Sequence, residues 1–107
     1  MTRRLNIVPR AEQDAQIFDW IAERSPDGAN RWFAAFEHAT KEVAQGSRPY
    51  GLAPEGQHVT YELRQFLFKT SHGRIYRGVF TVVGDEVRVL RIRGPGQPPL
   101  TADELGE

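Results

Sequence analysis

The sequence predicts an α+β domain in which a helical hairpin packs on one antiparallel sheet. Apolar residues recur at helical spacing between residues 9 and 46, and from Val59 onward they alternate with a period of two. A chain of 107 residues can bury a single core without disulfides, and this one has no cysteine. The predicted order is β-α-α-β-β-β, with a short N-terminal strand, the two helices and a three-stranded antiparallel meander in one sheet.

The first strand and the first helix meet at Pro9. The stretch RLNIVP supplies Leu5, Ile7 and Val8 to a short strand, which the proline ends. Proline suits the first position of a helix, where an N–H would have no partner within the helix. The helix is expected to reach about Arg24. Its core stripe is Ala11, Ala15, Phe18 and Ala22, widened by Ile17, Trp20 and Ile21.

The second helix follows the stretch SPDGAN, in which Ser25 or Asp27 can cap free N–H groups. It is expected to stop near Gly46. Because the link between the helices is short, they should form an antiparallel hairpin. The aromatic residues expected in the core of this hairpin are Phe18, Trp20, Trp32 and Phe36.

Three strand-like runs follow a loop over residues 46–58. The runs are VTYELRQFLF, RIYRGVFTVV and EVRVLRI, and Gly84-Asp85 between the last two predicts a tight hairpin. With helices on one face, the other face of the sheet should be at least partly open. The domain is expected to span residues 1–93, and residues 94–107, rich in Pro and Gly, should form a tail that is mobile or draped over the surface.

Composition excludes several classes of site. Without cysteine there is no thiolate catalysis, and His38, His58 and His72 are too far apart for a metal motif, so neither metal nor cofactor is expected. No apolar run approaches the ~20 residues of a membrane span, and the N-terminus lacks the apolar core of a signal peptide. We therefore expect a cytoplasmic protein.

Charge is balanced overall but unevenly placed. Residues 59–94 hold seven Lys or Arg against three acids, a net charge of +4, and the remainder carries −4. A basic sheet favours an anionic partner such as phosphate, nucleic acid or an acidic peptide. The alternative is ordinary solvated charge on the outer face of the sheet.

Arg77, in the stretch GRIYRGVF, is the most unusual of these cations. Alternation places it on the same face as Ile75, Val79 and Thr81, and a guanidinium among apolar neighbours needs an anionic partner. That partner is either a ligand or an acid of the chain, such as Glu62. The residues on either side of Arg77 support predictions of their own. Tyr76 should face the helices, and Gly78 would let a backbone or a ligand come close.

Several phrases, in this order, resemble the RelE/ParE superfamily, the toxins of bacterial type II toxin–antitoxin modules, which includes the plasmid stabilisation proteins. They are SPDGANRWF, GLAPE, YELR, YRGVFTV and GDEVRVLRI, and the resemblance covers roughly residues 6–92. Each phrase is short, and the specificity lies in their order and spacing.

The resemblance implies one of two activities. In ribonuclease members, which cleave mRNA on the ribosome, Arg77 lies at a phosphate-contacting position and Arg64 at a basic position used in acid–base work. Both could clamp a phosphate if they leave the sheet on the same face, with His72 as the nearest base. In the ParE-like branch the toxin is a protein ligand that binds DNA gyrase.

Departures from the ribonuclease pattern favour the gyrase-binding branch. Glu62 replaces a lysine, and GPGQPP replaces the basic residue after the last strand. Both branches imply an acidic, partly disordered antitoxin. The predicted binding residues are Arg64, Lys69, Arg74, Arg77, Arg88, Arg91 and Arg93. An interaction domain without toxic activity is a further alternative.

Overall fold

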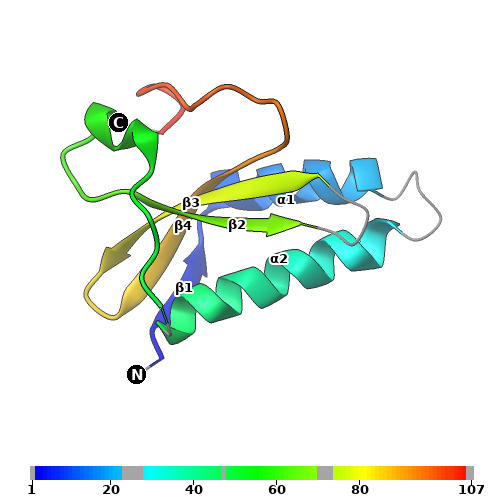
Figure 1. The fold of residues 1–107 in the computed structure, drawn as a ribbon, viewed down its shortest axis with the longest axis horizontal. Coiled ribbons are helices and arrows are strands. Elements are labelled where there is room, and N and C mark those ends of the chain that lie inside the picture. Colours follow the sequence, from blue (N-terminus) through cyan, green and yellow to red (C-terminus); the bar gives the residue numbers. More distant parts are fainter. Residues whose placement is uncertain (1, 23–27, 47, 70–73, 106–107) are drawn as a thin grey trace.

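The computed structural model describes residues 2–22, 28–46, 48–69 and 74–105 (Figure 1). The described elements follow the predicted order β-α-α-β-β-β. They are β1 (Arg4–Ile7), α1 (Pro9–Ala22), α2 (Gly28–Gln45), the 3-10 helix η1 (Pro54–His58), β2 (Arg64–Lys69), β3 (Ile75–Val83) and β4 (Glu86–Arg93). The predicted caps Ser25 and Asp27 lie outside the described residues.

The four strands form one sheet in the order β1-β4-β3-β2. Strands β2, β3 and β4 make the predicted antiparallel meander, and Gly84 has the positive φ of 61° expected of the turn between β3 and β4. β1 pairs with β4 in parallel, from Arg4 opposite Glu86 to Ile7 opposite Val89. The sheet is therefore mixed rather than wholly antiparallel, because alternation along a strand does not reveal the direction of its partner.

One face of the sheet packs against both helices through a core rich in aromatic residues. Trp32 stacks on Phe36, and Tyr76 makes edge contacts with Phe18 and Trp32, as predicted for its face. Trp20 was expected in this core, but it is 57% exposed. It lies two residues after the core residue Phe18, a rotation of about 200° around the helix.

The opposite face is covered by η1 and by the C-terminal segment, and Figure 1 shows both on the side of the sheet away from α2. A small second core joins them to the sheet and consists of Ala53, Leu63, Val79 and Leu100. The predicted open face persists only in part, at residues that include Leu67, Ile75 and Val83, which are exposed. Of the two arrangements expected for the tail, residues 94–105 are draped over the sheet.

The segment before β2 differs from the prediction. The alternating run from Val59 suggested a strand, yet β2 begins at Arg64. Val59 and Tyr61 pack instead against the second core, and Thr81 donates a hydrogen bond to the carbonyl of Glu62. Alternation here therefore reflects packing on the covered face and not membership of a strand. Among the described residues, no helix is long and apolar enough to cross a membrane.

Candidate functional site

Arg77 extends from the middle of β3 on the covered face and pairs with Glu55 of η1. Its Nη1 lies 2.8 Å from Oε1 and its Nη2 2.5 Å from Oε2 of the carboxylate, a two-point ion pair. Nη1 also lies 3.3 Å from Oε1 of Gln65, on the neighbouring strand. The Arg77 side chain is 18% exposed and that of Glu55 is fully buried. The guanidinium thus has an anionic partner within the chain, and this partner is Glu55 instead of Glu62.

Glu55 receives a third hydrogen bond, from the backbone N–H of Leu100, at 2.9 Å. Burial alone would raise the pKa of Glu55, but the hydrogen bonds from Arg77 and Leu100 outweigh burial and lower it. The carboxylate is therefore ionised at neutral pH. It joins three segments that are distant in sequence, namely η1, β3 and the C-terminal segment.

Arg64 does not join Arg77 in a phosphate clamp. In the register of β2 and β3, Arg64 lies opposite Phe80 and Arg77 opposite Leu67. Successive positions alternate between faces, so the two arginines leave the sheet on opposite sides, and the condition set for the clamp is not met. Arg64 donates to Glu62 Oε1 at 2.8 Å and to the carbonyl of Tyr50.

Gly78 is needed for packing on the helix face. A Cβ at this position would lie 2.1 to 2.7 Å from three atoms of the Phe66 ring. The group that approaches Gly78 is therefore an aromatic side chain of the core, and neither a ligand nor another backbone.

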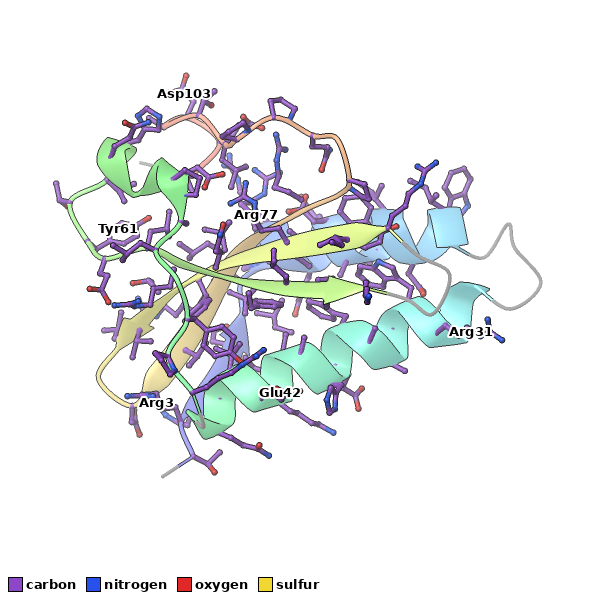
Figure 2. All side chains as sticks on the ribbon, in the orientation of Figure 1. Arg3, Arg31, Glu42, Tyr61, Arg77 and Asp103 are labelled. Atoms are coloured by element: carbon purple, nitrogen blue, oxygen red, sulfur yellow. The ribbon has the colours of Figure 1, made fainter. Side chains whose placement is uncertain are left out.

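Two further predicted arginines lie under the C-terminal segment. Arg93, opposite Arg77 in the register, donates to the carbonyl of Pro98 from Nε at 3.2 Å and from Nη2 at 2.6 Å. Arg91 makes a two-point pair with Asp14 of α1, at 2.8 and 3.1 Å, and this hydrogen bond raises the pKa of Arg91. Arg93 lies opposite Arg77 and Arg91 opposite Val79 in the register, so all three arginines leave the sheet on the covered face, each with a partner. Figure 2 shows where Arg77 lies.

The other predicted residues lie apart from this cluster. Arg64 and Arg88 line a shallow hollow of about 350 Å³ together with Tyr61 and Glu62. Lys69 and Arg74 are exposed at the ends of β2 and β3. His72, the predicted base, lies outside the described residues. Within the described part of the chain, no group of three His, Asp or Glu side chains could hold a metal ion.

Sequence reasoning missed an exposed apolar stripe on α1. Ile17, Trp20 and Ile21 lie three and four positions apart, which places them on one side of the helix, and about half of each side chain is exposed. They were expected to widen the core stripe. The signal that could have separated them is their angular position, since together with Ala11, Ala15, Phe18 and Ala22 they span more of the helix than one sheet face can cover.

Comparisons of the chain with protein-family models, curated proteins and solved structures found no match. Function must therefore be argued from the residues and their geometry.

Proposed function

We propose that this chain is the toxin of a type II toxin–antitoxin module of the RelE/ParE kind, that it inhibits growth by binding DNA gyrase, and that an acidic antitoxin neutralises it. Two arguments support the proposal. The phrases that resemble the family follow the family's order along the chain, with YRGVFTV in β3 and GDEVRVLRI in the turn before β4 and in β4 itself, an argument by analogy. The geometry of the arginines supports a protein ligand over a ribonuclease.

The Arg77–Glu55 ion pair is the observation that favours a gyrase-binding protein ligand over a ribonuclease. A ribonuclease of this kind needs free cations near the scissile phosphate, together with a base and an acid. Arg77 is held by a buried carboxylate, and Arg64 leaves the sheet on the other face. A protein ligand has no such requirement, because binding depends on a complementary surface.

The stripe of Ile17, Trp20 and Ile21 is the surface we assign to the protein target. Aromatic and aliphatic residues that are exposed together favour protein contacts, and tryptophan is enriched among residues that dominate binding energy. The stripe lies in the last two turns of α1, and about half of each side chain is exposed while the C-terminal segment is in place.

Ribosome-dependent cleavage of mRNA is the second candidate. It is favoured by the neighbouring positions of Arg77 and Arg93 in β3 and β4, which would present two guanidinium groups to one phosphate backbone. This activity would require Glu55 and the C-terminal segment to release both side chains.

A supercoiling assay with purified gyrase tests the proposal. We expect the chain to inhibit supercoiling and to cause cleaved DNA to accumulate when protein denaturant is added. No inhibition at a large molar excess of folded chain would rule out gyrase as the target. Cleavage of mRNA in a translating extract, at the codons occupied by ribosomes, would support the second candidate instead.

A further inference from the structure

The C-terminal segment, residues 94–105, is held to the sheet as a peptide is held in a binding groove. We call these residues the strap. Among the described residues, its backbone–backbone hydrogen bonds are local, from the Gln97 N–H to the Gly94 carbonyl and from the Leu105 N–H to the Thr101 and Ala102 carbonyls. Its contacts with the body of the protein are instead made with side chains that project from η1, the sheet and α1.

The body of the protein contacts the strap at three places: the backbone near Pro98 and Leu100, the Leu100 side chain, and the turn that follows. Two nitrogens of the Arg93 guanidinium donate hydrogen bonds to the carbonyl of Pro98, and the carboxylate of Glu55 accepts one from the N–H of Leu100. The Leu100 side chain is 1% exposed, between Ala53, Leu63 and Val79. The groove therefore recognises a short backbone segment with one buried leucine.

The third place of contact is the acidic turn that follows the leucine. The carbonyl of Glu104 accepts hydrogen bonds from Arg10 at 3.0 Å and Arg91 at 2.9 Å, and its carboxylate lies 3.5 Å from Nη1 of Arg93. Thr101 and Glu104 cap the turn reciprocally, through N–H bonds of 3.1 and 3.2 Å. Three guanidinium groups thus surround the residue four positions after the leucine, two at its backbone carbonyl and one, that of Arg93, near its carboxylate.

We infer that this groove is a peptide-recognition site filled by the chain's own strap, and that it takes a partner's acidic peptide in which a leucine is followed four residues later by Asp or Glu. Three arginines, Arg10, Arg91 and Arg93, contact the strap, and this positive charge favours an acidic partner. Among the described residues, the hydrogen-bond acceptors of Arg10 and Arg93 lie on the strap, so an incoming segment must supply acceptors for both. Release of the strap and binding of the partner are therefore coupled, whether or not the chain is a toxin.

The strap competes strongly with a partner peptide for the groove, because the strap is covalently attached to the sheet. Residues 94–97 of the strap connect its anchored part, residues 98–105, to the end of β4, which gives that part an effective concentration on the order of millimolar in the groove. A partner peptide should consequently bind the unaltered chain weakly. It should bind better to any chain whose strap is weakened without damage to the groove.

Fluorescence anisotropy with a labelled peptide of residues 97–105, QPPLTADEL, tests the inference on the full chain. The chain with Leu100→Ala should bind the peptide at least about tenfold more tightly than the unaltered chain, since its strap has lost the buried side chain. A peptide that itself carries Leu100→Ala should bind at least about tenfold less well, and one that carries Glu104→Gln should bind less well by a smaller factor, since only Arg93 contacts that carboxylate. Leu52→Ala, at a leucine that is 63% exposed, is the matched control and should leave binding unchanged.

A second variant covers the case in which Leu100→Ala does not fold. Thr101→Ala with Glu104→Gln removes the reciprocal cap at exposed or half-buried positions and should also raise peptide affinity. The inference is overturned if the peptide binds neither variant, or if its affinity is indifferent to its leucine. It is also overturned if a short single-stranded RNA binds the Leu100→Ala chain and the peptide does not, which would make the groove a phosphate site.

Discussion

Arg77 and Glu55 are separated by 22 positions in the chain and form a two-point ion pair inside the protein, with the carboxylate fully buried. This relationship explains why a strand of the sheet carries an arginine among apolar neighbours. The buried carboxylate has three donors, two from Arg77 and one from the Leu100 N–H, so its charge is compensated within the fold.

Removal of Arg77 should therefore cost stability before it affects any activity. Arg77→Met leaves Glu55 buried without its cation, and we expect the free energy of unfolding to fall by about 3–5 kcal/mol. Urea unfolding followed by circular dichroism measures this loss. Arg74→Met, at an exposed position three residues earlier, should change stability by less than about 0.5 kcal/mol. Equal effects of the two substitutions would show that the pair contributes little.

The same pair predicts a loss of stability in acid. The pKa of Glu55 is lowered on folding, so the stabilisation is present above the ordinary glutamate pKa of about 4.3 and is lost as pH falls through the lower value in the folded protein. Glu86 and Glu104 also have lowered pKa values, so the test is a difference between variants. Urea midpoints from neutral pH into acid should fall less steeply for Glu55→Gln than for the unaltered chain. Parallel curves would contradict the assignment.

Gly78 should be intolerant of a side chain. The methyl group of Gly78→Ala would overlap the Phe66 ring, and overpacking of this kind costs about 1–3 kcal/mol or more. Gly51→Ala is the matched control, because a Cβ there meets nothing within 4 Å. Thermal unfolding should separate the two variants, and Phe66→Leu combined with Gly78→Ala should recover part of the loss.

The α1 stripe should carry the binding to gyrase. Trp20→Ala removes an aromatic side chain that is mostly exposed, and we expect at least a tenfold loss of inhibition in the supercoiling assay, since truncation of a dominant interface residue costs about 2 kcal/mol or more. Val83→Ala, an exposed residue of β3, is the control and should inhibit as the unaltered chain does. Full inhibition by the Trp20 variant would remove the stripe from the target-binding surface.

The order of elements could be predicted because local signals specify it. Pro9 begins α1, Gly46, with a φ of 66°, follows α2, and Gly84 makes the turn between β3 and β4. The face of Tyr76 followed from alternation alone. These features depend on residues close to one another in sequence.

The candidate site could not be predicted because it depends on long-range contacts. Glu55 lies in a segment rich in Gly and Pro whose lack of periodicity predicted only a loop, and nothing local distinguishes it from an exposed acid. The strap presented the same difficulty, because its composition fits a mobile or a draped tail equally, while its anchors, Leu100 among them, contact residues that are distant in sequence. The acceptors of buried guanidinium groups become visible only when the chain is folded.

The most direct test of the proposed function is the incorporation of labelled thymidine and labelled amino acid during the first minutes after the chain is induced in a bacterial host without an antitoxin. We expect thymidine incorporation to fall first, because gyrase is required for replication. Amino acid incorporation falling first would contradict gyrase as the target and favour cleavage of mRNA. If neither falls while folded protein accumulates, the chain is not a toxin.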